Sequence, residues 1–346
     1  MLRQTYRANT TKYRGATMSV YITESIIKIL VIIAVFTALG GFSTYLERKV
    51  LGIFQRRIGP NYVGPFGLLQ PLADGIKLFC KEDIIPLNAN RLMFIIAPII
   101  AVVSALVAMS PIPFFPEFEV FGHTITPIVA DVNMGILLFL AISSCGIYSP
   151  LLAGFSSHSK YSLIGGARAV VQFVSYEMIT GLSLLAPLMI VGSLSLIDIN
   201  NYQANISDWL IFKQPLAFVL FACAAFVELN RTPFDLLEHE AEIVSGYCTE
   251  YSGLKWGIFF IGEYANMIAV CFIFSLLFFG GFNPIGFIPG GIAILLKVCF
   301  FIFLFMWVRA TLPHIRSDQL LKACWKVLLP LALLNVCITG IVLLLL

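Results

Sequence analysis

The sequence is poor in charged residues and lacks the motifs of a cofactor-binding protein. Only 12% of its 346 residues are Asp, Glu, Lys or Arg, about half the share of a soluble domain. Its four histidines lie far apart, its eight cysteines occur singly without a CxxC pair, and no glycine-rich phosphate loop is present. These absences argue against a haem, zinc or nucleotide site built on one of the common motifs. We expect no metal or cofactor bound by this chain alone, and no nucleic acid among its partners.

Long apolar runs dominate what is present. Hydrophobic residues make up 59% of the chain, and the mean hydropathy is +0.92. Runs of this length predict an all-α, polytopic membrane protein of about eight spans, each able to cross about 30 Å of hydrocarbon. The predicted spans are residues 25–46, 92–112, 134–155, 169–193, 209–227, 256–282, 285–308 and 327–346.

The first 17 residues differ from the rest of the chain. They are basic, contain no acid and precede a second methionine, Met18. A targeting peptide would account for this composition, and so would a start upstream of the true one at Met18, which we favour. We expect residues 1–17 to be a disordered extension and residues 18–346 to form a single membrane domain.

The placement of lysine and arginine predicts the orientation of the spans. The connections 47–91, 156–168, 228–255 and 309–326 together hold 15 of these residues, whereas the opposite connections hold only Lys213. Basic connections face the cytoplasm, or the matrix in a mitochondrion. We therefore place these four segments on that side and both termini on the other.

One of the basic segments contains an amphipathic stretch. Within residues 65–81 a set of apolar side chains recurs at helical spacing, and a set of charged ones forms a second stripe. The first set is Leu68, Leu72, Ile76 and Phe79, and the second is Asp74, Lys77 and Lys81. This pattern predicts a helix that lies in the membrane interface.

A second segment, residues 228–250, is unusually acidic. Its six carboxylates are Glu228, Asp235, Glu238, Glu240, Glu242 and Glu250. With Thr232 as N-cap and Pro233 as the first helical residue, a helix would begin here. Asp235, Glu238 and Glu242 would then share one face. Carboxylates held that close suit proton handling, although a solvated acidic loop is the commoner explanation of such a composition taken by itself.

Three charged residues lie inside predicted spans. Glu177, Glu263 and Lys297 would each cost about 2.5–3.5 kcal/mol at the bilayer centre, so such residues usually face a bundle interior or water. Glu177 and Glu263 fall seven or eight residues into their spans, or about 10–12 Å deep at 1.5 Å per residue. With Glu228 and the loop acids they predict a proton path from the surface inwards. Structural ion pairs between helices are the alternative.

Aromatic and cationic side chains near the same surface suggest a site for an amphipathic ligand. Interfacial anchoring is the commoner role of such aromatics. The candidates are Tyr251, Tyr247, Phe234, Phe54 and Tyr62, with Arg48, Arg56 and Arg57.

Five long motifs follow one another along the chain. They are ERKVLGIFQRRIGPNYVGPFGLLQPLADGIKLFCKE at 47–82, GGARAVVQFVSYE at 165–177, ELNRTPFDLLEHEAEIVSGYCTEYSG at 228–253, GEYANM at 262–267 and WVRATLPHIRSDQL at 307–320. In wording and order they resemble the motifs of one family, the H subunits of NADH-quinone oxidoreductase (respiratory complex I), which includes the mitochondrial NADH dehydrogenase subunit 1.

The resemblance implies a membrane subunit that forms part of a quinone chamber and couples quinone reduction to proton translocation. Partner subunits would carry the iron–sulfur clusters and the site for NADH or another donor, and would dock on the cytoplasmic loops. Antiporter-like subunits and lipid would lie beside it. The implied quinone-binding residues are Arg48, Arg56, Arg57 and Asp74, to which the aromatic candidates Phe234 and Tyr251 are added. The implied proton-coupling residues are Glu177, Glu228, Asp235, Glu238, Glu240, Glu242 and Glu263.

Two positions depart from the family pattern, and other functions stay open. His239 stands where many relatives have glycine or alanine, and His314 replaces a frequent arginine. The wording of the acidic motif favours a bacterial inner membrane over a mitochondrial one. A related subunit of a membrane-bound hydrogenase would share the fold, although the intact first motif argues against it. A stand-alone proton or cation transporter would also place acids inside spans, but no internal repeat is evident.

Overall fold

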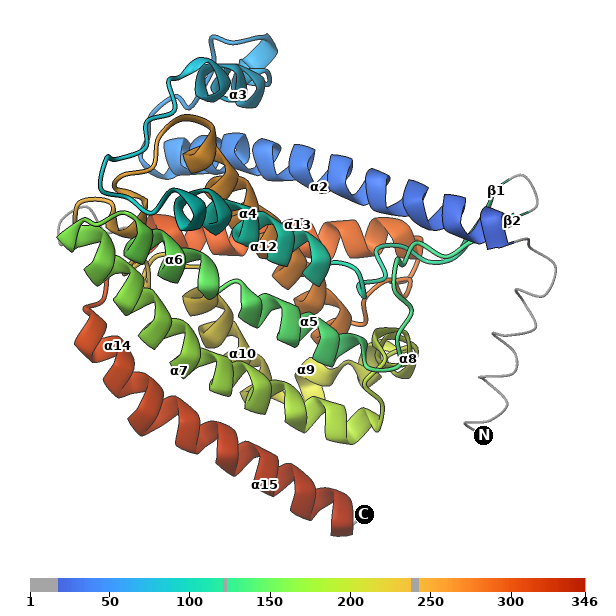
Figure 1. The fold of residues 1–346 in the computed structure, drawn as a ribbon. Coiled ribbons are helices and arrows are strands. Elements are labelled where there is room, and N and C mark those ends of the chain that lie inside the picture. Colours follow the sequence, from blue (N-terminus) through green and yellow to red (C-terminus); the bar gives the residue numbers. More distant parts are fainter. Residues whose placement is uncertain (1–17, 121–122, 238–242, 346) are drawn as a thin grey trace.

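The computed structural model describes residues 18–120, 123–237 and 243–345, which form a helical bundle with one small β-hairpin (Figure 1). Within these residues, seven helical runs are long and apolar enough to cross a membrane. They are α2 (Met18–Phe54), α4 (Arg91–Ala108), the pair α5 (Gly135–Cys145) and α6 (Tyr148–Ser156), α7 (Lys160–Val191), α12 (Gly253–Phe278), α13 (Gly290–Thr311), and the run of α14 (Ser317–Ala323), η4 (Cys324–Leu328) and α15 (Leu329–Leu345). The predicted all-α membrane class is confirmed.

The fifth predicted span, 209–227, is not one continuous helix. It consists of α9 (Leu210–Lys213) and α10 (Pro215–Glu228), which meet at Gln214. Pro215 has no N–H to continue the first helix and instead begins the second. The 14 residues of α10 extend only about 21 Å, which is less than the hydrocarbon thickness of about 30 Å.

Two other spans are interrupted for local reasons. In the third, α5 ends before Gly146, where the Ser143 and Ser144 hydroxyls donate back to the Leu140 carbonyl. Such bonds bend helices, and Pro150 removes the N–H that would continue the ladder. In the last span, η4 is a π-helical turn directly before Leu329 and Pro330, and the proline explains the local change of winding because it too lacks an N–H.

The remaining elements are short and lie at the ends of the bundle. The predicted amphipathic helix is present as η1 (Pro65–Gly67) and α3 (Gln70–Cys80); that it lies in the membrane interface stays a prediction. An antiparallel hairpin of β1 (Phe118–Val120) and β2 (His123–Ile125) was not predicted. The other short helices are α8 (Leu196–Tyr202), η2 (Ile206–Asp208) and η3 (Gly246–Cys248).

Helix α12 forms the centre of the bundle. It packs against α2, α4 and α13, and nearly every residue from Tyr264 to Phe278 is buried. By contrast, α2 and α15 expose most of their apolar side chains, as expected of helices that face lipid or another subunit. Figure 1 shows α3 and α14 at one end of the bundle, and the hairpin and α8 at the other. The four basic segments therefore share one end; that this end faces the cytoplasm stays a prediction.

A close backbone contact links α7 to the turn η3. A Cβ atom on Gly165 would lie 2.8 Å from the Tyr247 nitrogen and 2.9 Å from the Gly246 backbone. Real Cβ atoms do not approach so closely, and only backbone movement would relieve the clash. Gly181, further along α7, has nothing within 4 Å of a Cβ.

We predict that Gly165→Ala lowers the free energy of unfolding by about 1–3 kcal/mol because of this clash. The matched change Gly181→Ala should leave stability equal or raise it by up to about 1 kcal/mol, since alanine favours a helix over glycine. Unfolding in mixed micelles measures both. Equal effects of the two variants would show that the contact between α7 and η3 is unimportant.

Candidate functional site

The acidic stretch follows α10 as a series of turns and not as a helix. Residues 229–237 contain no helical segment, so the predicted helix start at Thr232 and Pro233 is wrong. Asn230 has a φ of 49°, in the left-handed region where a right-handed helix cannot continue, and the Thr232–Pro233 peptide bond is cis. The predicted shared face of Asp235, Glu238 and Glu242 therefore does not begin at Pro233.

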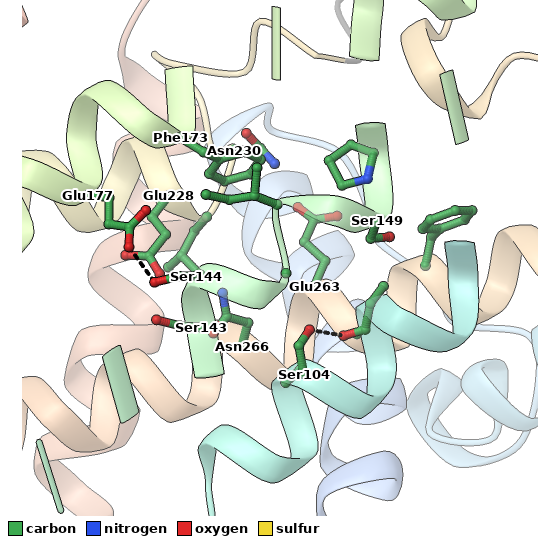
Figure 2. Close-up of a pocket in the computed structure, with 18 of the residues that line it drawn as sticks. Ser104, Ser143, Ser144, Ser149, Phe173, Glu177, Glu228, Asn230, Glu263 and Asn266 are labelled. Atoms are coloured by element: carbon green, nitrogen blue, oxygen red, sulfur yellow. Dashed lines mark hydrogen bonds between the residues drawn. The ribbon is translucent and has the colours of Figure 1, made fainter. Parts of the chain in front are cut away.

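A partly open cavity of about 100 Å³ lies beside this turn, and Glu177 at its wall is exposed. Three carboxylates line it: Glu177 from α7, Glu228 from the end of α10 and Glu263 from α12 (Figure 2). Hydroxyl and amide groups make up much of the remaining wall, namely Ser104, Ser143, Ser144, Ser149, Thr180, Asn230 and Asn266. A polar cavity of this size has room for several water molecules. The sequence prediction that Glu177, Glu228 and Glu263 belong together is therefore consistent with the fold.

Two of the three carboxylates are neighbours. Figure 2 shows Glu177 and Glu228 side by side, with Glu263 at another part of the wall. Two serine hydroxyls on α5 each share their single proton between the Leu140 carbonyl and one of these acids, Ser144 with Glu177 Oε1 and Ser143 with the Glu228 carboxylate. Like charges at short range repel. Moving a proton onto one carboxylate therefore affects the other, which is what a proton relay requires.

A second, smaller cavity of about 20 Å³ shares part of its wall with the first. Asn230, Tyr247 and Glu263 line both, and Asp235 and Arg309 line only the second. The two cavities therefore form a polar series from the Asp235 turn to Glu177 and Glu228. Glu263 lies where they meet.

A buried ion cluster bounds the smaller cavity. Glu47 on α2 accepts from Arg231 at 3.0 Å and from the Tyr264 hydroxyl at 2.7 Å, and it also pairs with Arg309. Arg231 lies 3.5 Å from Glu263, and its guanidinium is over the Tyr264 ring at 4.5 Å. Burial alone would lower the pKa of Arg231, but the Glu263 and Glu47 carboxylates hold it above the ordinary value.

Sequence reasoning did not identify Glu47 or Arg309 as site residues. The predicted first span ended at residue 46, which would put Glu47 in a solvated loop. Helix α2 continues to Phe54, so Glu47 lies within a helix and its side chain is 6% exposed. An acid directly after a long apolar run, at a helical position, was the available signal.

The predicted quinone-binding cations lie at the outer end of α2 and on the connection to α3. Arg48 forms an ion pair with Asp74 at 2.6 Å, and Gln70 donates to the same carboxylate at 2.9 Å. Arg56 and Arg57 are exposed. Because Glu47 and Arg48 are consecutive on one helix, the end of α2 connects this surface to the buried cluster.

The two aromatic residues assigned to quinone binding, Phe234 and Tyr251, are packed into the protein. Tyr251 is 5% exposed, and its ring stacks on Phe94 at 4.0 Å. Its hydroxyl donates to the Phe94 carbonyl, and burial raises its pKa above the ordinary value. Phe234 is half-buried between apolar clusters. Their role in quinone binding stays a prediction.

The other predicted charges lie elsewhere. Lys297 is buried and donates to the Gly281 carbonyl at 2.7 Å, beside the Trp209 ring. It lines neither of the two cavities described above, so it does not belong to the predicted series. Glu238, Glu240 and Glu242, together with His239, lie outside the described residues.

Comparison with known proteins places this arrangement in a family. A family model described as NADH dehydrogenase matches residues 27–340. The chain belongs to the NADH dehydrogenase family. It is 73% identical to a Helicobacter hepaticus protein named as the H subunit of NADH-quinone oxidoreductase, over 93% of this chain and 98% of that protein. Proteins of the same name from Helicobacter acinonychis and Helicobacter pylori strain J99 are each 67% identical over 94% of this chain and 100% of their own length.

We predict that Glu47→Gln lowers the free energy of unfolding by about 3–5 kcal/mol, because it removes the buried carboxylate that Arg231 and Arg309 share and leaves Glu263 as the one carboxylate described beside Arg231. The control Asp318→Asn breaks an exposed pair with Arg316, where Asp318 is 49% exposed, and should cost at most about 1 kcal/mol. Denaturant unfolding in micelles compares them. A loss below about 1 kcal/mol for Glu47→Gln, no larger than that of an exposed pair, would contradict a structural role of the cluster.

Proposed function

We propose that this chain is the H subunit of a proton-translocating NADH-quinone oxidoreductase in a bacterial inner membrane. It forms part of the quinone chamber and transfers the effect of quinone reduction to proton-carrying groups inside the membrane. It acts only as part of the complex. Quinone is the substrate, and the clusters and the donor site belong to partner subunits.

The observation that carries this proposal is the continuity of polar groups from the end of α2 to the middle of the bundle. Arg48 on α2 and Asp74 on α3 lie at the surface, and the buried Glu47 directly precedes Arg48 on α2. Arg231 joins Glu47 to Glu263, and Glu263 lines both cavities.

A charge change near the quinone can pass along these ion pairs to the buried acids. Reduction of a quinone takes up two electrons from a partner subunit and two protons, and the quinol is neutral. Each proton drawn from a side chain of the chamber leaves that side chain one unit more negative, so the local charge of the protein changes. Ion pairs in a medium of low dielectric respond strongly to such a change. A change at Arg48 and Asp74 therefore reaches Glu47 and Arg231. Their effect on Glu263 can shift protons among Glu263, Glu228 and Glu177.

The partners follow from the distribution of charged and apolar surfaces. Cluster-bearing subunits of the peripheral arm dock on the end that carries α3 and the basic loops. Antiporter-like membrane subunits dock on the side of α7 where Glu177 is exposed. A carboxylate exposed at this depth is costly in lipid, so a protein partner covers it in the complex. Lipid contacts the remaining apolar faces.

We predict that Glu228→Gln lowers both quinone reduction and proton pumping at least tenfold in the assembled complex, because an amide cannot take up and release a proton. We expect the same direction of change for Glu238→Gln and Glu242→Gln. Asp131→Asn, an exposed acid at the other end of the bundle, is the control. Full activity and an unchanged proton-to-electron ratio for Glu228→Gln would overturn the coupling role.

We also predict that Asp74→Asn raises the KM for quinone several-fold while the complex assembles normally. The change removes the ion pair with Arg48, which orders the connection between α2 and α3. Steady-state kinetics with a soluble quinone analogue measure the effect. Unchanged quinone kinetics and inhibitor affinity would count against a chamber at this surface.

A further inference from the structure

A buried glutamine on α7 contacts both ends of the acidic turn. Gln172 is 2% exposed. Its side-chain Nε2 lies 3.0 Å from the Val227 carbonyl, 3.2 Å from the Phe234 carbonyl and 3.3 Å from Asn230 Oδ1. Its two amide hydrogens are thus shared among three acceptors that enclose the turn from 227 to 234.

Two of these acceptors are backbone carbonyls at the two ends of the turn. Each also accepts one backbone hydrogen bond inside the turn, Val227 from the Asn230 N–H at 3.2 Å and Phe234 from the Leu236 N–H at 2.9 Å. Val227 directly precedes Glu228, and Phe234 directly precedes Asp235. The Gln172 amide therefore ties α7 to the carbonyls immediately before two of the proposed proton-coupling acids.

The same helix carries the other acid of the neighbouring pair. Glu177 follows Gln172 by five residues on α7, about 7.5 Å along the axis. A rigid helix fixes Glu177 relative to Gln172, and the amide fixes Glu228 relative to Gln172. The separation of Glu177 and Glu228 thus depends on this side chain.

The buried position of the oxygen of the same amide lowers the stability of the fold. Across the described parts of the chain, the buried Gln172 Oε1 has no hydrogen-bond partner. Burying an unpaired acceptor destabilises a protein. An apolar side chain of similar length would avoid this cost, so the donor side of the amide is what the position uses.

We propose that Gln172 is a positioning residue that holds the 227–234 turn against α7 and thereby sets the geometry of Glu177 and Glu228 for proton transfer. The inference rests on the proposed function of those two acids. The proposal requires that loss of the amide donors changes how Glu177 and Glu228 take up and release protons. A loss of folded protein alone would not be enough.

Gln172→Met in the intact complex tests this directly, since methionine keeps the length and removes the donors. The control is Gln214→Met, which changes another buried glutamine, one that donates to Thr339 and accepts from Asn335. Hydrogen–deuterium exchange of residues 228–237 measures how often the backbone of the turn opens. The pH profile of quinone reduction, per assembled complex, measures how the protonation of the acids affects the rate. Should Gln172→Met fail to assemble, Gln172→Asn supplies the same readouts, since it keeps the amide but withdraws it by one methylene.

The expected result is at least tenfold faster exchange at 228–237, a kcat reduced at least threefold with KM within twofold, and a changed shape of the pH profile. Gln214→Met should show none of these. A rate that falls equally at every pH, or exchange at 228–237 that is unchanged, would overturn the proposal.

Glu228→Gln, measured in parallel, separates this inference from the proposed function. If Glu228→Gln impairs coupling while Gln172→Met leaves exchange and pH profile unchanged, only the positioning role fails. If Glu228→Gln is fully active and coupled, the function assigned to the acids fails, whatever Gln172→Met does.

Discussion

The cost of placing charge inside an apolar bundle governs the functional half of this protein. An unpaired carboxylate or guanidinium at membrane depth costs several kcal/mol, and Glu47, Arg231, Glu263 and Arg309 meet this cost by pairing with one another. Breaking such a cluster leaves a buried charge without compensation. The cluster therefore holds α2, α12, α13 and the turn after α10 in one arrangement, on which both cavities depend.

The same constraint explains the division of the bundle into two halves. Near the acidic turn, hydroxyl and amide groups line a cavity that accommodates Glu177 and Glu228. Further along α12 and α13, aromatic rings such as Phe274 and Phe301 stack closely, and the polar groups satisfy one another, as Gln203 does with backbone atoms of Leu276 and Gly280. The polar groups that line the two cavities thus lie at one end, and a closely packed core with paired polar groups lies at the other.

Much of the fold and part of the candidate site were predictable from the sequence, because apolar runs determine spans almost without regard to their neighbours. Acids inside spans, such as Glu177 and Glu263, are conspicuous for the same reason, and they do meet at one cavity. The acidic turn was misread because Pro233 also begins many helices, and only packing against α7 shows that the chain turns there. Glu47 was missed because its role depends on where α2 ends, and Gln172 because a glutamine carries no charge signal. Both act through contacts between residues far apart in the chain, and a single sequence does not reveal such pairs.

If Glu177 and Glu228 exchange protons when quinone is reduced, the protonation of at least one of them must change with the redox state of the quinone. Infrared difference spectroscopy of the assembled complex on quinone reduction tests this most directly, because the C=O stretch of a protonated carboxyl group is resolved from that of a carboxylate. We predict a carboxyl band that changes on reduction and is lost in Glu228→Gln and Glu177→Gln. A spectrum identical in the wild type and both variants would contradict the proton exchange.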